Sequence, residues 1–187
     1  EGVLQYHSAA NCGIYCYFNS TQEDAVTARL RAHVPNWRQI SALDDDAVAA
    51  MIRADGIDIL VDLSGHTSGN RLLVFARKPA PVQVTWLGYC NTTGLGNMDY
   101  LLADAGVIPP DTAQRFSEQV LRLPGSYLCY VAPDYAPAVA PPPGIANGYV
   151  TFGCFNNLSK VTEAMLALWA EILRRVPDAR FILKSKQ

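Results

Sequence analysis

Short apolar runs alternate with amphipathic segments along most of the chain. Four runs have the length and the β-branched or aromatic content of strands: residues 11–18, 57–63, 82–87 and 100–103. Three further segments place apolar side chains at helical spacing: residues 22–33, 44–56 and 71–77. Strands that alternate with helices in this way predict an α/β fold, a mostly parallel sheet with helices on its faces.

Individual residues sharpen these assignments. Ala25, Val26 and Leu30 form the apolar stripe expected of the first helix. Asp44 is a preferred N-cap residue and predicts the start of the second helix. The run at residues 57–63 (IDILVDL) is apolar enough to predict a buried strand.

The composition changes at residue 132. Residues 132–144 (APDYAPAVAPPPG) hold five of the twelve prolines and few large aliphatic side chains, which predicts a stiff, extended linker. The pattern then restarts as one strand–helix–strand unit: residues 149–155, 162–176 and 180–184. Such a unit, ~40 residues long, is too small to form a stable domain alone. We therefore predict three parts: residues 1–131, a linker at 132–147, and a βαβ unit at 148–187.

Composition and charge exclude several classes of function. Half of the residues are hydrophobic and 17% are charged, which is typical of a globular protein. The net charge of −2, with both signs interspersed, predicts no nucleic-acid or anionic-membrane partner. No apolar run approaches the ~18–20 residues that span a bilayer. With no charged-then-apolar leader in view, we expect a cytoplasmic protein.

The cysteines favour free thiols. Their number is odd and no C-x-x-C pair occurs, which argues against a zinc site and a disulfide framework: Cys12, Cys16, Cys90, Cys129 and Cys154. On a strand at residues 11–18, Cys12 and Cys16 would point to one face. We expect buried free thiols in a reducing compartment.

Three polar loops follow predicted strands and are candidates for ligand binding, because ligands of parallel α/β sheets bind beyond the carboxyl ends of the strands. They are residues 65–70, 88–97 and 156–160. In the third, Lys160 comes just before a helix that Thr162 caps and Glu163 opens. Free backbone N–H groups and a positive charge there would favour a phosphate. The alternative is an ordinary solvated lysine.

Other candidate residues leave two interpretations open. His66, in the first loop, could bond a phosphate or sugar hydroxyl or act as a base, or could be a loop histidine bonded to backbone. Arg71, at the start of the next predicted helix, is the cation nearest to His66 in the sequence, although charges on a helix surface are usually solvated. Asp44-Asp45-Asp46 indicates the start of a helix, and we predict no metal site there. The pair Gly94 and Gly96 lacks the third glycine of a dinucleotide fingerprint.

Two blocks of the sequence resemble a known family. RKPAPVQVTWLGY lies within residues 57–104, FNNLSK lies within residues 149–184, and both follow the order seen in the O-GlcNAc transferase and Spindly family, glycosyltransferase family 41. The resemblance implies a GT-B architecture of two Rossmann-like lobes, with a nucleotide sugar in the cleft. Residues 1–131 would be the C-terminal part of the first lobe, and residues 148–187 the start of the second, nucleotide-binding lobe. The resemblance also implies that this chain works together with the rest of the catalytic region and with tetratricopeptide repeats upstream.

The resemblance also implies roles for single residues. Lys160 matches the family lysine that contacts the donor diphosphate and supports its departure, and Asn157 matches a neighbouring nucleotide contact. Leu87 and Gly88 match the loop that lines the sugar pocket. Arg71 and, more loosely, His66 match a strand-end loop near the acceptor path.

The function expected from this resemblance is the transfer of a sugar from a nucleotide-sugar donor to Ser or Thr hydroxyls of proteins. UDP-GlcNAc is the favoured donor. We expect the transfer to invert the configuration of the sugar and to need neither a metal ion nor a cofactor. Cys90 stands where O-GlcNAc transferases have proline, and the SGHT and NTTGL segments resemble the Spindly branch, which is associated with fucose. GDP-fucose is therefore the alternative donor, and a non-catalytic scaffold the alternative class. The catalytic histidine and a further nucleotide motif of the family are expected outside this chain.

Overall fold

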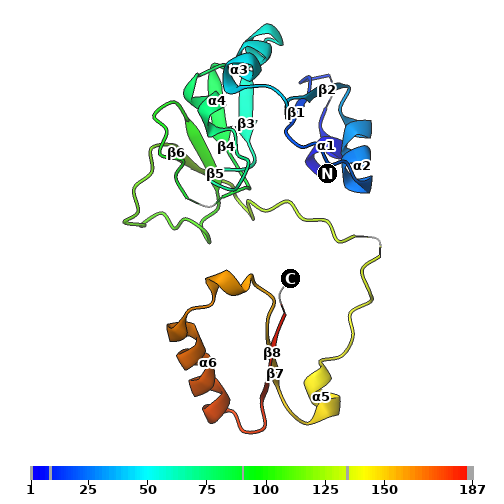
Figure 1. Ribbon diagram of the computed structural model, residues 1–187, viewed down its shortest axis with the longest axis vertical. Coiled ribbons are helices and arrows are strands. Elements are labelled where there is room, and N and C mark those ends of the chain that lie inside the picture. Colours follow the sequence, from blue (N-terminus) through cyan, green and yellow to red (C-terminus); the bar gives the residue numbers. More distant parts are fainter. Residues whose placement is uncertain (1, 9, 90, 134, 185–187) are drawn as a thin grey trace. The chain divides into compact units, whose positions relative to one another are not determined.

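The computed structural model describes residues 2–8, 10–89, 91–133 and 135–184, and it divides into two compact units, residues 1–132 and 133–187 (Figure 1). Unit one contains α1 (Gly2–Tyr6), β1 (Tyr15–Phe18), α2 (Ala25–His33), β2 (Asn36–Gln39), α3 (Asp45–Ala54), β3 (Ile59–Asp62), α4 (Leu72–Ala76), β4 (Val82–Thr85), β5 (Tyr100–Ala103) and β6 (Gln119–Arg122). Unit two contains α5 (Pro143–Asn147), β7 (Thr151–Cys154), the 3-10 helix η1 (Leu158–Lys160), α6 (Glu163–Arg175) and β8 (Arg180–Leu183).

All strand pairs in the described parts of the chain are parallel. Unit one has a pair, β1–β2, and a four-stranded sheet in the order β3-β4-β5-β6, while β7 and β8 form a separate sheet in unit two. The mostly parallel α/β class predicted from the sequence is confirmed. The assignment of the two units to two lobes stays a prediction.

The four-stranded sheet of unit one is covered on one face by α3 and α4. Leu60 of β3 packs there against Val48, Ile52 and Phe75 in the main apolar core. The other face of β3 is open, because Ile59 and Val61 keep 59% and 41% of their surface exposed. The prediction of a buried strand at residues 57–63 is therefore wrong for one of its two faces.

A polar cluster joins the β1–β2 pair to α3. The Arg38 guanidinium of β2 binds both carboxylate oxygens of Asp55, at 2.8 and 3.2 Å, and the Tyr17 hydroxyl of β1 donates to the same carboxylate at 2.9 Å. The hydrogen bond from Arg38 holds the pKa of Asp55 below its ordinary value. Asp55 is the C-cap of α3, so this cluster fixes the end of that helix against the first strand pair.

Several elements differ from the sequence prediction at the N-terminal side. The strand at residues 11–18 is only Tyr15–Phe18, so Cys12 precedes it and does not share a strand face with Cys16. Cys12 and Cys129 are exposed, and Cys16 and Cys154 are half-buried. All four are free thiols, but the expectation that the thiols are buried is wrong. Cys90 lies outside the described residues. Val26, in the predicted apolar stripe of α2, is 46% exposed.

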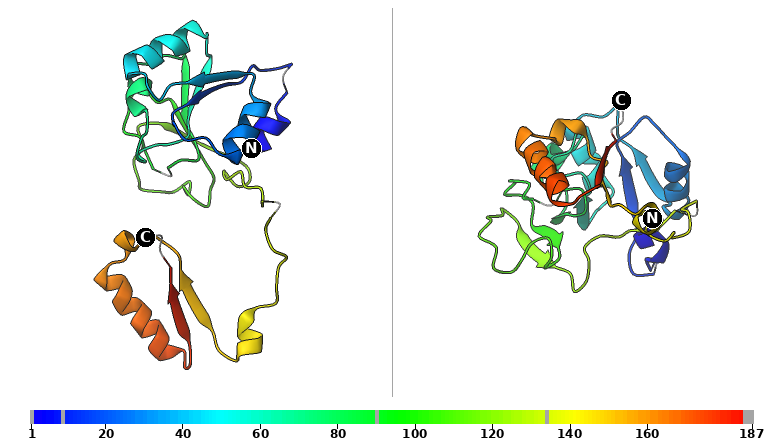
Figure 2. Two further views of the ribbon diagram at one scale, coloured as in Figure 1. Left: turned by 45° about the vertical axis from the view of Figure 1, so that its right-hand side comes forward. Right: turned by 90° about the horizontal axis from the view of Figure 1, so that it is seen from below.

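The strands and long helix of unit two form one βαβ unit (Figure 2). The Trp169 ring of α6 stacks on Phe181 of β8 with ring centroids 4.7 Å apart, but no described residue of this unit is fully buried. Leu168 stays 59% exposed and Ile182 51%. The helix predicted at 162–176 is confirmed, with Thr162 accepting from the Met165 amide as its N-cap.

The proline-rich segment contains a helix that the sequence analysis missed. Pro143 stands at the first position of α5, where its fixed φ suits a helix and its missing N–H costs nothing. Gly148 ends the helix in the left-handed region, at φ +72°. The extended linker is therefore shorter than the predicted residues 132–147. Within the described ranges, no helix is both long and apolar enough to cross a membrane.

Candidate functional site

The carboxyl ends of β3 and β4 are joined by the buried carboxylate of Asp62. It accepts hydrogen bonds from the amides of Ser64 and Gly65, at 3.0 and 2.9 Å, and from the Thr85 hydroxyl at 2.9 Å. Its side chain is at the end of β3 and only 4% of the residue surface is exposed. Asp62 thus fixes the loop after β3 to the end of β4, where parallel sheets bind ligands.

The loops after β3 and β4 touch at two glycines. A Cβ at Gly88 would lie 2.2 Å from the carbonyl oxygen of Leu63, and one at Gly65, where φ is +54°, would lie 2.4 Å from the Cβ of Tyr89. Distances below 3.0 Å leave no room for a side chain. Glycine is therefore required at both positions for the two loops to approach each other this closely.

Leu87, a predicted sugar-loop residue, has a strained backbone. Its φ is +70°, and the Gly88 amide donates to the Trp86 carbonyl at 2.8 Å, which closes a three-residue γ-turn around Leu87. Positive φ in a non-glycine residue costs ~1–3 kcal/mol, and such strain is enriched at binding and active sites. The turn leaves the Leu87 side chain partly exposed, at 36%.

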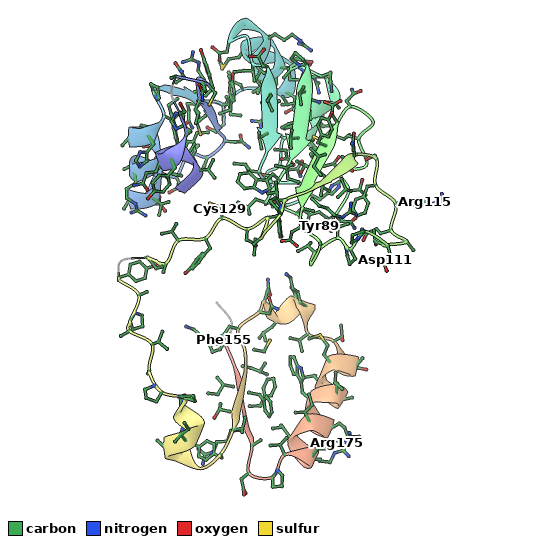
Figure 3. The ribbon with its side chains drawn as sticks, turned by 180° about the vertical axis from the view of Figure 1, so that it is seen from behind. Tyr89, Asp111, Arg115, Cys129, Phe155 and Arg175 are labelled. Atoms are coloured by element: carbon green, nitrogen blue, oxygen red, sulfur yellow. The ribbon has the colours of Figure 1, made fainter. Side chains whose placement is uncertain are left out.

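His66 is bonded to the backbone of the next loop. Its Nε2 lies 3.2 Å from the Thr92 carbonyl oxygen, and its ring meets Tyr89 edge-on at 5.6 Å between centroids. Tyr89 is 42% exposed and lies beyond the end of the sheet, where Figure 3 labels it. The backbone-bonded interpretation of His66 describes this geometry, and a role toward phosphate or sugar stays a prediction.

The loop at residues 91–95 is held by Glu118, which sequence reasoning missed. The carboxylate accepts from the Thr93 amide at 2.7 Å, from the Thr92 hydroxyl at 2.8 Å and from the Thr93 hydroxyl. Burial raises the pKa of Glu118, but the hydrogen bonds from Thr93 and Thr92 outweigh it and bring the pKa below its ordinary value. Glu118 is therefore a buried, ionised acceptor with 6% of its surface exposed.

Asp104 organises the end of β5 in the same way. Its carboxylate accepts from the amides of Tyr127, Val107 and Gly106, each at 2.9 Å. These hydrogen bonds, that from Tyr127 first, lower the pKa of Asp104. The Tyr127 carbonyl in turn receives the Trp86 indole N–H at 2.9 Å. The three adjacent strands β3, β4 and β5 thus end in loops that buried carboxylates hold in place.

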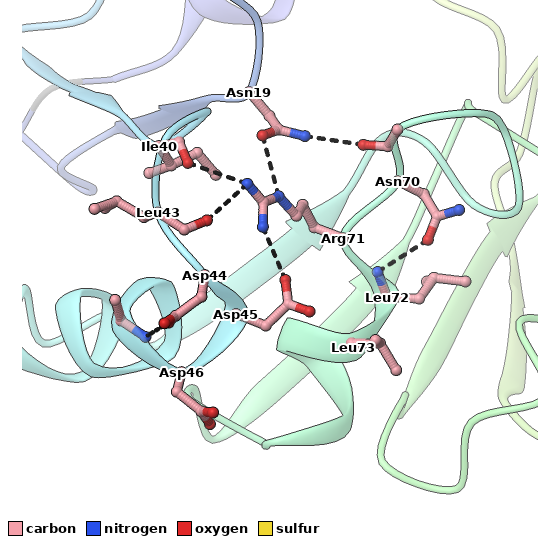
Figure 4. A network of polar contacts seen from close by, with 12 residues as sticks. Asn19, Ile40, Leu43, Asp44, Asp45, Asp46, Asn70, Arg71, Leu72 and Leu73 are labelled. Carbon is pink, nitrogen blue, oxygen red and sulfur yellow. Dashed lines mark hydrogen bonds and ion pairs between the residues drawn. The ribbon is translucent and has the colours of Figure 1, made fainter.

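Arg71 is a structural cation in this arrangement (Figure 4). Its guanidinium donates to Asp45 at 2.9 Å, to Asn19 at 3.0 Å, and to the carbonyls of Ile40 and Leu43 at 3.1 and 3.0 Å. Only 23% of the Arg71 side chain is exposed, so Arg71 is not the solvated surface charge that a helix position usually indicates. Its predicted place near the acceptor path stays a prediction, and its donors are engaged within unit one.

The three consecutive aspartates start α3, as predicted. Asp44 caps the helix by accepting from the Ala47 amide at 2.8 Å, and Asp45 pairs with Arg71. Asp46 pairs with Arg77 at 2.5 Å, and this hydrogen bond lowers the pKa of Asp46. In the described part of the chain, no three or more His, Cys, Asp or Glu side chains are grouped so that they could hold a metal ion.

Lys160 stands at the end of η1, two residues before the N-cap of α6. Asn157 caps η1 by accepting from the Ser159 amide at 3.0 Å, so its side-chain oxygen is engaged. Lys160 is exposed, and no partner for its ammonium occurs among the described residues. The helix that follows is thirteen residues long. A free cation thus precedes a helix N-terminus whose amides and dipole favour anions.

The comparison with known proteins covers the whole chain. Residues 1–133 match the family described as Glycosyl transferase family 41. A probable UDP-N-acetylglucosamine–peptide N-acetylglucosaminyltransferase SPINDLY of Petunia hybrida is 46% identical over 190 residues, which cover 100% of this chain and 20% of that protein. The corresponding SEC protein of Arabidopsis thaliana is 33% identical and covers 95% of this chain and 19% of its own length.

A solved structure shows the same fold. A mutant O-GlcNAc transferase of Thermobaculum terrenum superposes with a TM-score of 0.90 at 44% identity, covering 98% of this chain and 34% of that one. The chain spans about a fifth of the length of the curated relatives it matches. With a family match over most of its length and relatives at this identity over all of it, the chain belongs to glycosyltransferase family 41.

Proposed function

We propose that the protein of which this chain is a part transfers a sugar from a nucleotide-sugar donor, UDP-GlcNAc favoured, to Ser or Thr hydroxyls of proteins. Membership of family 41 supports this, as do relatives whose names describe UDP-N-acetylglucosamine–peptide transferases. The observation in the structure that carries it furthest is the Lys160 ammonium, which has no partner in the described part of the chain and lies just before the N-terminus of α6.

In this proposal Lys160 stabilises the leaving group. The acceptor oxygen forms a bond to the anomeric carbon while the bond from that carbon to the diphosphate oxygen breaks, which inverts the configuration. The proton of the hydroxyl passes to a base, and negative charge grows on the departing diphosphate. A lysine ammonium beside a helix N-terminus can neutralise that charge, so the step is proposed to need no metal ion.

The loop after β4 is proposed to contact the sugar. Gly88 brings this loop against the end of β3, and the γ-turn at Leu87 holds its side chain outward in a conformation that costs free energy. We propose Leu87 and Gly88 as donor-binding residues, and Asn157 as a neighbour of the nucleotide.

A second donor has support of its own. The SGHT and NTTGL segments at residues 64–67 and 91–95 resemble the Spindly branch, and this resemblance implies an association with fucose. GDP-fucose is therefore the alternative donor.

The test is transfer by the full-length protein with each donor in turn. Labelled UDP-GlcNAc and labelled GDP-fucose are supplied with a mixture of acceptor proteins, and label on Ser or Thr is measured by mass spectrometry. Transfer from UDP-GlcNAc supports the main proposal, and transfer from GDP-fucose alone replaces it by the alternative. Absence of transfer from both would identify a non-catalytic scaffold.

A further inference from the structure

Glu118 is a buried carboxylate with three hydrogen bonds near the candidate site, and the proposed function does not use it. It lies directly before β6, and the amide of the next residue, Gln119, donates to the Asp99 carbonyl at 2.9 Å to begin the pairing with β5. The carboxylate is therefore carried by a backbone that the four-stranded sheet holds rigidly. Its side chain reaches the loop at residues 91–95 and not bulk water.

Three hydrogen bonds connect this carboxylate to the loop. Oε1 receives the amide and the hydroxyl of Thr93, and Oε2 receives the hydroxyl of Thr92. The Thr92 hydroxyl oxygen also accepts from the amides of Gly94 and Ser117, both at 3.1 Å. Ser117 Oγ lies 2.9 Å from the same hydroxyl. A hydrogen bond to a charged carboxylate is stronger than a neutral one, so the bond to Glu118 is the charge-assisted contact among those that hold Thr92.

The loop in turn sets His66. The carbonyl oxygen of Thr92 lies 3.2 Å from His66 Nε2, and the imidazole meets the exposed Tyr89 ring edge-on. Tyr89 follows Gly88, so this pair adjoins the strained turn at Leu87. A continuous set of contacts therefore runs from Glu118 through Thr92 to His66 and Tyr89.

We infer that Glu118 is a positioning residue for the donor sugar: through Thr92 it holds the His66–Tyr89 pair in the arrangement that receives the sugar. This inference rests on the proposed function. It predicts that binding of the sugar-bearing donor and binding of the free nucleotide respond differently to the loss of Glu118. Glu118 acts on the loops of unit one, whereas the nucleotide contacts proposed above, Lys160 and Asn157, lie in unit two. Loss of Glu118 weakens binding of the sugar-bearing donor and leaves binding of the free nucleotide unchanged.

The experiment measures binding of UDP-GlcNAc and of UDP to the full-length protein by calorimetry, together with KM and kcat. Glu118→Met keeps the bulk of the side chain and removes its acceptors, and we expect UDP-GlcNAc to bind ~10-fold more weakly with UDP unchanged, as for the loss of about one hydrogen bond. Glu118→Gln keeps one oxygen for Thr93 and should restore affinity to within about threefold. Glu23→Ala, which removes an exposed glutamate of unit one, is the control and should change neither affinity.

A double-mutant cycle separates positioning from a merely structural role. If Glu118 acts through His66, His66→Ala alone and the pair Glu118→Met with His66→Ala should each weaken UDP-GlcNAc by the same ~10-fold, not ~100-fold together. Thr93→Val keeps the shape of the side chain but removes the hydroxyl that donates to Glu118. It allows the same measurement of donor affinity if Glu118→Met does not fold. Its effect should also disappear in the His66→Ala background.

The outcomes distinguish this inference from the proposed function. Additive losses, equal losses for UDP and UDP-GlcNAc, or unchanged affinities in Glu118→Met and Thr93→Val would overturn the role of Glu118 alone. A wild-type protein that binds neither ligand, nor GDP-fucose, would overturn the proposed function and this role with it. A donor-specific, non-additive loss that glutamine restores supports both.

Discussion

Replacing Gly88 by alanine tests whether the close approach of the two strand-end loops builds the candidate site. The added Cβ would lie 2.2 Å from the Leu63 carbonyl oxygen, 2.5 Å from the Leu63 carbonyl carbon and 2.7 Å from the Ser64 Cα. All three are backbone atoms, so no side-chain rotation relieves the clash. Ordinary contact begins near 3.4 Å, so the loops must separate by about 1 Å.

That movement is opposed by Asp62, which fixes Ser64 and Gly65 to the end of β4. Overpacking in a well-packed region costs ~1–3 kcal/mol, and a backbone clash held by such bonds belongs at the upper end. About 3 kcal/mol corresponds to a roughly 10²-fold larger local opening constant. Backbone hydrogen exchange of residues 62–66 and 85–88 in the full-length protein measures this directly.

Gly96 supplies the matched control in the same part of the chain. A Cβ there meets nothing within 4 Å, and its φ lies outside the left-handed region. Gly96→Ala should therefore leave exchange unchanged or slow it slightly, by up to ~1 kcal/mol. A Gly88→Ala protein whose protection matches that of Gly96→Ala would show that the loops do not depend on the contact.

Two further predictions follow from backbone strain and from charge. Leu87→Gly relieves the strain of the positive φ and should raise the free energy of unfolding, measured in urea, by ~1 kcal/mol. The same variant should raise KM for the donor. Greater stability with an unchanged KM would show that Leu87 is not part of the donor site. Glu118 and Asp104 have pKa values below their ordinary 4.5 and 3.8, so the stability they contribute is present above those values and is lost as pH falls through the lowered pKa. The protection factors of the Thr93 and Tyr127 amides, which correct for the intrinsic pH dependence of exchange, should therefore fall below about pH 4. Protection factors that rise on acidification would contradict this.

The sequence predicted those features that depend on local pattern. The parallel α/β class, the helix started by Asp44 and the helix capped by Thr162 follow from alternation and capping chemistry, which neighbouring residues determine. The strands β2 and β6 were missed because four residues with mixed polarity carry little periodic signal. Their place is set by pairing with β1 and β5, which lie elsewhere in the chain.

The candidate site shows the same division. Lys160 stood out because its loop follows a predicted strand, and Leu87 and Gly88 stood out because they match the sugar-pocket loop of the family. Glu118 lies in a polar stretch with no local feature to distinguish it. Its partners Thr92 and Thr93 are more than twenty residues away in sequence, and only the fold brings them together. Asp62 left a weak signal, a charged residue at the end of an apolar strand. The sequence indicated a solvated Arg71 because its four partners lie in two segments, residue 19 and residues 40–45, that only the fold brings next to it.

The central claim, that this chain supplies the group that stabilises the departing diphosphate, is tested most directly by Lys160→Ala in the full-length protein. Arg174→Ala is the control, because it removes an exposed cation from the other end of α6. Single-turnover transfer and donor binding are measured for both variants. We predict that Lys160→Ala lowers turnover ~10²–10³-fold with little change in donor affinity, while Arg174→Ala leaves both unchanged. Turnover of Lys160→Ala equal to that of the wild type would contradict the account.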